Sequence, residues 1–143
     1  MKLSPLSMRG FTLLELMVVI AIISILASLT APTFTRQIAK ANLLEAQNLA
    51  TQHQSLIEEF ILLNGDFPSV DDFNAVKQTL SDDSIAKTIA ITESNGLKVT
   101  LNKSTGIAEN AYLTYTRDTN RNWQCTSDLD ANILPAKCTA LAE

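Results

Sequence analysis

The chain opens with a long apolar stretch that keeps a helical period beyond its uncharged part. Between Glu15 and Arg36 lie 20 residues without a charged side chain. As a helix that rises about 1.5 Å per residue, this stretch spans about 30 Å, the thickness of the hydrocarbon core of a bilayer. The pattern therefore predicts a membrane-spanning helix, and Pro32 is the expected position of a kink in it.

Residues 34–63 continue the helical period and become amphipathic. Apolar side chains fall on two rows, and we expect the wider row to cover a sheet. The wider row holds Phe34, Ile38, Ala41, Leu49, Leu56, Phe60 and Leu63, and the narrower row holds Leu43, Ala50, Ile57 and Ile61. Glu45 interrupts the wider row without an explanation from the pattern. His53, which has no catalytic partner in sequence, is expected at the surface or in an interface.

After Asn64-Gly65 and Pro68, which predict the end of the helix, the period changes. Residues 69–84 predict a short helix that begins at Ser69. Alternation with a period of two then predicts strands, with turns at residues 95–96 and 104–106. The predicted strands are 88–92, 97–101, 111–116 and 123–126. The predicted fold class is therefore α+β, with a long N-terminal helix packed on an antiparallel meander of about four strands.

Two cysteines, Cys125 and Cys138, lie near the C-terminus and flank a short polar segment. Their spacing matches no zinc signature, and no second pair accompanies them. In an exported chain they indicate a disulfide that closes a C-terminal loop, and two buried free thiols are the alternative. Asp128 and Asp130 within the loop are too few to predict a calcium site.

Composition narrows the classes of function. The 143 residues carry a net charge of −4, which argues against a general nucleic-acid-binding protein, since phosphate affinity needs clustered cations. The sequence contains no nucleophile elbow, phosphate-binding glycine loop or HExxH motif. We therefore expect no enzyme activity, no cofactor and no metal.

The N-terminal segment has two common explanations that fit it poorly. A cleaved secretory signal has an apolar region of about 7 to 15 residues and a small-residue cleavage site, whereas this region is longer and lacks such a site. A plain anchor explains the length but not Glu15, because an acid inside the membrane boundary is costly without a partner. Lys2 and Arg9 precede the apolar run and place the N-terminus in the cytoplasm.

The segment Gly10-Phe11-Thr12-Leu13-Leu14-Glu15 resembles the processing site of type IV prepilins of the short-leader class. Near the C-terminus, Trp123-Gln124-Cys125 and the proline of Pro135-Ala136-Lys137-Cys138 resemble the end of the same family. The resemblance thus covers both ends of the chain.

The resemblance implies that a prepilin peptidase cuts between Gly10 and Phe11 and methylates the new Phe11 amine. It also implies that Glu15 pairs with the N-terminal amine of an adjacent subunit, and it places Thr12 and Pro32 with Glu15 among the assembly residues. The implied division is a cleaved leader (1–10), a transmembrane and filament-core half of the helix (11–35), and an external head domain (36–143).

The implied function is that of a structural subunit of a type IV pilus, a filament for adhesion, twitching motility or DNA uptake. Its implied partners are other pilin subunits, the peptidase and the inner-membrane assembly platform, and it passes from the inner membrane to the extracellular pilus. A pseudopilin of type II secretion is one alternative. A minor DNA-receptor pilin is the other, with Arg117, Arg121, Lys137 and Trp123 as the DNA contacts.

Overall fold

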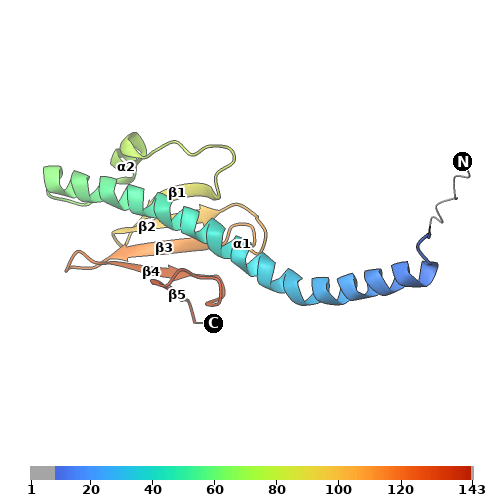
Figure 1. Cartoon of the computed structure of the whole chain (residues 1–143). Coiled ribbons are helices and arrows are strands. Elements are labelled where there is room, and N and C mark those ends of the chain that lie inside the picture. Colours follow the sequence, from blue (N-terminus) through green and yellow to red (C-terminus); the bar gives the residue numbers. More distant parts are fainter. Residues whose placement is uncertain (1–8, 143) are drawn as a thin grey trace, which may run out of the picture. The chain divides into compact units, whose positions relative to one another are not determined.

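The computed structural model describes residues 9–142, so most of the predicted leader, including Lys2, lies outside the described residues (Figure 1). The chain divides into two compact units, residues 1–34 and residues 35–143. Helix α1 (Leu13–Asn64) is 52 residues long and contributes to both units, with Pro32 inside it.

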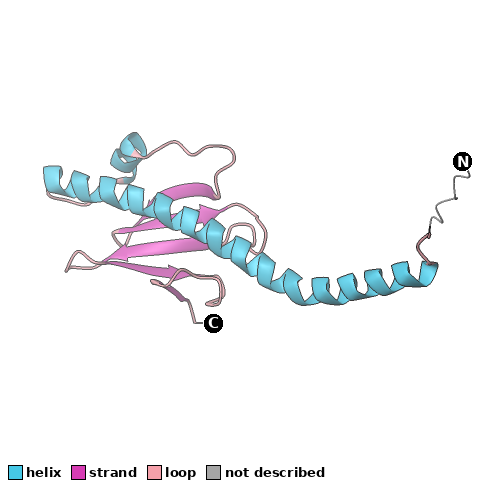
Figure 2. Cartoon of the chain, viewed as in Figure 1, coloured by secondary structure: helices cyan, strands magenta, loops and turns pink. Residues whose placement is uncertain are grey.

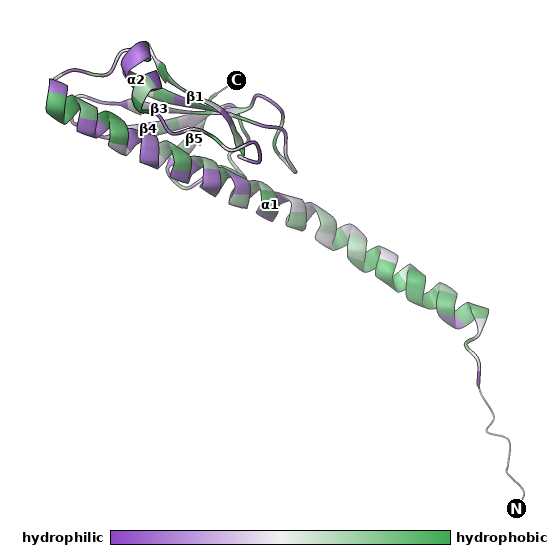
Figure 3. Ribbon diagram, turned by 90° about the horizontal axis from the view of Figure 1, so that it is seen from above, coloured by the Kyte–Doolittle hydropathy of each residue, from purple (hydrophilic) through white to green (hydrophobic). Residues whose placement is uncertain are grey.

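The first unit consists, in its described part, of the apolar half of α1. Its leucine, isoleucine, valine and methionine side chains are all exposed, and this half is almost uniformly hydrophobic (Figure 3). By length and composition, α1 is the one helix of the described chain that could cross a membrane. A continuous exposed apolar surface of this kind requires lipid or other protein around it.

The second unit packs the polar half of α1 on one face of a five-stranded sheet (Figure 2). The first four strands form the predicted antiparallel meander in chain order: β1 (Ala86–Thr92), β2 (Gly96–Leu101), β3 (Tyr112–Arg117) and β4 (Trp123–Ser127). A fifth strand that the sequence did not predict, β5 (Cys138–Ala140), pairs parallel to β4. The α+β fold is thereby confirmed.

The helix face that covers the sheet differs from the predicted one. None of the seven residues of the wider row is fully buried, and Phe34 and Leu63 are 67% and 75% exposed. Of the predicted narrower row, Leu43, Ala50 and Ile57 are buried. The full set of buried positions follows a four–three spacing: Ala39, Leu43, Ala46, Ala50, His53 and Ile57. The prediction placed the larger apolar side chains against the sheet, whereas three of the six buried positions are alanines. Glu45 is exposed and therefore needs no buried partner.

The small side chain of Ala39 lets the turn at Gly106 approach the helix closely. At Gly106, which has a φ of +76°, an added Cβ would stand 2.9 Å from the Cβ of Ala39 and 3.3 Å from the carbonyl oxygen of Thr35. A larger residue at either position 39 or 106 would push the helix and the turn apart. The predicted turn at residues 104–106 is confirmed by the bridge between Ser104 and Ile107.

The prediction that His53 lies at the surface is wrong. Its side chain is fully buried, with Nδ1 2.7 Å from the Leu49 carbonyl oxygen and Nε2 accepting the Gln78 backbone N–H at 3.3 Å. It holds the segment after α2 (Val70–Val76) against α1. That helix is shorter than the predicted 69–84, but it begins with a capping box in which Ser69 and Asp72 bond each other's backbone N–H.

Candidate functional site

The N-terminal end of α1 is organised by Thr12 and Glu15. The Glu15 backbone N–H donates to Thr12 Oγ1 at 3.2 Å, while Glu15 Oε2 accepts from the Thr12 backbone N–H at 2.9 Å. This reciprocal pair is a capping box, and its sequence signal is the T-x-x-E pattern of residues 12–15. It gives Glu15 a partner within its own helix, and it places the start of α1 two residues after Phe11.

The predicted processing residues lie just before this cap. Gly10 and Phe11 are exposed, and the Phe11 side chain is 86% exposed. A Cβ added at Gly10 would meet no atom within 4 Å. Cleavage and methylation here, and the assembly roles of Thr12, Glu15 and Pro32, remain predictions.

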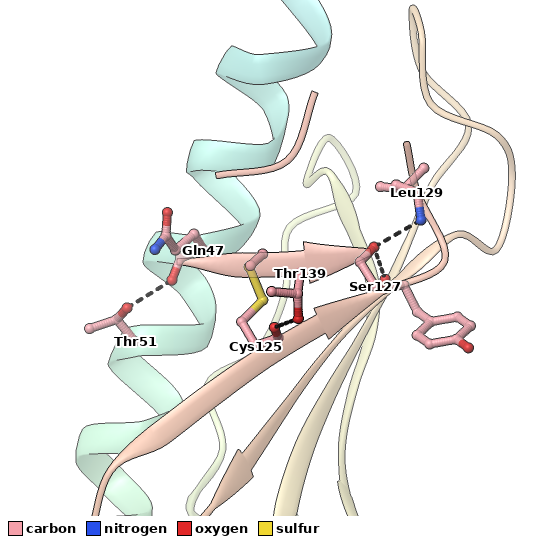
Figure 4. The surroundings of a disulfide bond; sticks show 8 residues. Gln47, Thr51, Cys125, Ser127, Leu129 and Thr139 are labelled. Carbon is pink, nitrogen blue, oxygen red and sulfur yellow. Dashed lines mark hydrogen bonds between the residues drawn. A yellow bond between two sulfur atoms is a disulfide. The ribbon is translucent and has the colours of Figure 1, made fainter. Parts of the chain in front are cut away.

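The C-terminal cysteines form the predicted disulfide, Cys125–Cys138, with a Cα–Cα distance of 4.5 Å. It links β4 to β5, and Thr139 Oγ1 adds a hydrogen bond to the Cys125 carbonyl oxygen (Figure 4). Gln47 and Thr51 of α1 lie beside this link. The disulfide therefore fixes the last strand of the sheet next to the helix.

Helix and sheet are further joined by a polar cluster around Glu58. Arg117 donates from Nε to Oε1 at 2.6 Å and from Nη2 to Oε2 at 3.0 Å, and Trp123 Nε1 donates to Oε1 at 2.9 Å. The hydrogen bond from Arg117 is the main cause that lowers the pKa of Glu58, and Glu58 in turn raises the pKa of Arg117. We call this group the Glu58 clamp.

The four predicted DNA contacts have different surroundings. Arg117 and Trp123 belong to the Glu58 clamp, so the guanidinium of Arg117 is already ion-paired. Arg121 and Lys137 are exposed and line the same pocket as Trp123. Nearby Asp118 is bonded by the backbone N–H groups of residues 120 and 122, and the hydrogen bond from Asn122 is the main cause that lowers its pKa.

The pocket that Arg121, Trp123 and Lys137 line has a volume of about 400 Å³. Helix α1 contributes polar side chains from one face of it, including Gln47, Thr51 and Gln54, and strand β3 contributes Tyr115. We call this cavity the helix–β4 pocket. The sequence did not predict it, because its walls come from segments about 70 residues apart.

Tyr115 is the buried polar group of that pocket. The residue is 5% exposed, and its hydroxyl has no hydrogen-bond partner in the described part of the chain. Burial raises the pKa of Tyr115 to about 12. Among the described residues, no group of three or more His, Cys, Asp or Glu side chains is arranged to hold a metal ion.

Comparison with known proteins identifies the family. Residues 39–139 match the sequence model of pilin, described as a bacterial filament protein, and residues 6–31 match the prokaryotic N-terminal methylation motif.

Two similar proteins cover nearly the whole chain. The fimbrial protein EcpC of Eikenella corrodens is 31% identical over 137 residues, which cover 91% of this chain and 90% of that protein. The type IV major fimbrial protein FimA of Dichelobacter nodosus is 26% identical over 148 residues, which cover 91% and 95%. A fimbrial protein of Neisseria meningitidis is 44% identical over 61 residues, which cover 43% of this chain and 36% of that protein. With its methylation motif, exposed apolar helix and disulfide-closed sheet, this chain belongs to the pilin family.

Proposed function

We propose that this chain is a structural subunit of a type IV pilus and that its apolar half-helix packs with those of other copies in the filament core. The observation that carries the proposal is a helix whose first half has no buried side chain, on a chain of the pilin family. In an isolated subunit, the exposed apolar surface of the half-helix needs lipid around it. In a filament, the same half-helices of neighbouring subunits replace the lipid. The relatives named as fimbrial proteins support this reading over a secretion pseudopilin.

Processing precedes assembly in this proposal. The peptidase cuts between Gly10 and Phe11 and methylates the Phe11 amine, while the chain is held in the inner membrane with its N-terminus in the cytoplasm. The exposure of both residues supports access to the bond. The inner-membrane platform then adds the processed subunit to the growing pilus, which carries it outside the cell.

Glu15 sets the register of each added subunit. A carboxylate in an apolar core is costly when unpaired, so a subunit docked in the wrong register is disfavoured. In the free subunit, the Glu15 carboxylate accepts hydrogen bonds from Thr12 in the capping box, so it is partly satisfied. On docking, the amine of a neighbouring Phe11 supplies the opposite charge. The residue therefore acts on specificity of assembly.

The test replaces Glu15 with alanine in cells that carry no other copy of the gene. We expect normal processing of the Glu15→Ala chain, because the cut bond is unchanged, and few or no filaments in the sheared surface fraction. Glu45→Ala is the matched control, since Glu45 is an exposed acid on the same helix, and it should keep wild-type filaments. Normal filaments from Glu15→Ala would contradict the register role.

A further inference from the structure

We propose that the Cys125–Cys138 disulfide is a latch on strand β5. Once a thiol reduces the disulfide, β5 can leave the sheet, and the edge of β4 then accepts the β5 of a second copy of this chain. Both strands belong to the second unit, so this exchange needs no filament. Two features support it, which are the way β5 is held and the strand edge that it covers.

Strand β5 contributes no buried side chain to the sheet. Cys138 is half-buried, and Thr139 and Ala140 are exposed. The neighbouring strand β4, by contrast, buries Cys125 and Ser127. Because burial of apolar surface is the dominant stabilising contribution in folding, a strand without it opens more readily than the rest of the sheet.

The pairing of β5 with β4 is short. It covers three residues and is parallel, whereas the other neighbouring strands pair antiparallel over longer stretches. Around this ladder, Thr139 Oγ1 donates to the Cys125 carbonyl oxygen at 3.2 Å, and the Leu141 backbone N–H donates to the Ser127 carbonyl oxygen at 2.8 Å. The disulfide joins Cys125 and Cys138, the first pair of the register (Figure 4). It is therefore the main attachment of β5.

A thiol reductant opens this attachment. Its thiolate attacks the sulfur of Cys138, because Cys138 is half-buried whereas Cys125 is buried. The sulfur of Cys125 leaves and takes up a proton, and a second thiol of the reductant then releases Cys138 as a thiol. The two cysteines have gained two hydrogens, and the reductant has become a disulfide. Afterwards β5 is attached to β4 by hydrogen bonds alone.

The edge that β5 covers is suited to another strand. In the sheet order β1-β2-β3-β4-β5, departure of β5 makes β4 the edge, and the backbone groups on that side lose their partners. The hydrogen bond from Leu141 shows that the Ser127 carbonyl oxygen faces this edge. An extended segment adds to such an edge through main-chain hydrogen bonds.

The occupant that fits this edge is the β5 of a second copy. An identical strand brings the same register, in which Cys138 lies opposite Cys125 and Thr139 lies opposite Thr126. Residues 128–137 connect β4 to β5, so β5 can reach a neighbouring chain while β1 to β4 stay paired. Exchange of an identical element between copies restores the same contacts at a low free-energy cost. Reoxidation then links Cys125 of one copy to Cys138 of the other.

The latch is tested by backbone amide exchange of the full chain in detergent, before and after reduction. Reduction should accelerate exchange of the Leu141 amide, and in the reduced chain this amide should exchange about tenfold faster than those of β2 or more, because β5 opens by itself. An unchanged rate at Leu141 after complete reduction would overturn the latch. Equal rates at Leu141 and in β2 of the reduced chain would also overturn it, since β5 would then open only when the whole head unfolds.

The occupant is tested with two single-cysteine chains. A Cys125→Ser chain and a Cys138→Ser chain are mixed in detergent and oxidised, and the disulfide-linked dimers are separated by mass. Strand exchange places Cys138 of the first chain opposite Cys125 of the second. The mixed dimer should therefore exceed the two like dimers together by about threefold or more, whereas random collision gives no such excess.

Two proline variants of the Cys125→Ser chain show whether strand pairing produces the excess. Thr139→Pro removes a backbone N–H of β5 and the Oγ1 hydrogen bond to residue 125, so it should abolish the excess of mixed dimer. Ala142→Pro is the matched control, because Ala142 lies beyond β5, and it should leave the excess unchanged.

A mixed dimer without any excess, or equal yields from Thr139→Pro and Ala142→Pro, would overturn exchange with a second copy. None of these measurements needs a pilus, so each outcome leaves the proposed structural function to its own test.

Discussion

Glu58 and Arg117, 59 residues apart in sequence, form a two-pronged ion pair that joins the long helix to the third strand of the sheet. The Arg117 side chain is 16% exposed and that of Glu58 is 37% exposed, so water screens the pair only in part. Trp123 shares the same carboxylate, which ties the β3–β4 hairpin to the helix as well.

Glu58→Ala should destabilise the head by about 1–2 kcal/mol, because it removes three hydrogen bonds and takes the ion-pair partner from the mostly buried Arg117 side chain. Denaturant unfolding of the full chain in detergent, followed by Trp123 fluorescence, measures the change. Glu59→Ala is the control, since Glu59 is the exposed neighbour on the same helix and has the same helix propensity. Equal stabilities of the two variants would show that the Glu58 clamp contributes nothing.

The clamp also predicts a dependence of stability on pH. The folded state lowers the pKa of Glu58, chiefly through Arg117, so the unfolded chain takes up a proton first as the pH falls. The contribution of the clamp is complete above the ordinary carboxyl pKa of about 4 and is lost as the pH falls through the lowered value.

Unfolding midpoints measured between pH 7 and pH 3 check this dependence. The wild type and Glu59→Ala should lose stability together below about pH 4, and Glu58→Ala should decline less steeply because it lacks one of the groups involved. Parallel curves for Glu58→Ala and the wild type would assign the acid sensitivity to other carboxylates, such as Asp118, whose pKa is also lowered.

The close approach of the helix to the turn at Gly106 predicts a difference between two glycine variants. Both Gly65 and Gly106 have positive φ angles, of 88° and 76°, so an alanine is strained at either by about 1 kcal/mol. At Gly106 the added methyl also meets Ala39, at 2.9 Å, whereas at Gly65 it meets nothing within 4 Å.

Gly106→Ala should therefore cost about 1–3 kcal/mol more than Gly65→Ala in the same denaturant measurement. Comparing the two variants separates the cost of the packing clash from the cost of backbone strain, since both variants carry the strain. A Gly106→Ala chain as stable as Gly65→Ala would mean that the turn moves away from α1 without loss.

The disulfide predicts sensitivity to reduction. Cys125 and Cys138 are 13 residues apart, and opening a link over a loop of this size lowers stability by about 2–4 kcal/mol. Adding a thiol reductant should bring the wild-type unfolding midpoint to that of the Cys125→Ala, Cys138→Ala double variant, whose own midpoint should not move. If the unfolding midpoint of the wild type did not change on complete reduction, a stabilising role of the disulfide would be excluded.

Sequence patterns predicted the elements of this chain better than its contacts. The apolar run, the strands of the meander and the cysteine pair are local signals, and each was found at or near its expected position. Even Asn95, expected in a hairpin turn, has the positive φ of 53° that such a turn uses. The three-residue strand β5, which pairs parallel to β4, was missed because it has too few residues for an alternating period to be visible.

The buried helix face was predicted wrongly because the pattern ranked side chains by size and hydrophobicity. The face that packs on the sheet is set by position around the helix and not by side-chain size, so Ala39, Ala46 and Ala50 are buried while Phe34 is exposed. His53 was missed for a related reason: its two buried hydrogen bonds reach Leu49 and Gln78, and only the fold brings Gln78 near.

The sequence could not predict the helix–β4 pocket or the Glu58 clamp. Each joins α1 to strands about 60 to 70 residues later in the chain. Arg117 was grouped with Arg121 and Lys137 as a basic patch, whereas its ion pair with Glu58 separates it from them. Charge patterns predict which residues are polar, but the partner of each is set by tertiary packing.

The central claim, that this chain is processed and assembled into a pilus, is tested most directly by the intact mass of protein sheared from the cell surface. The mass should match a chain that begins at Phe11, carries one added methyl group, and gains two hydrogens when Cys125–Cys138 is reduced. A chain that begins at Met1, or a processed chain found in the membrane and never in the sheared fraction, would contradict the account.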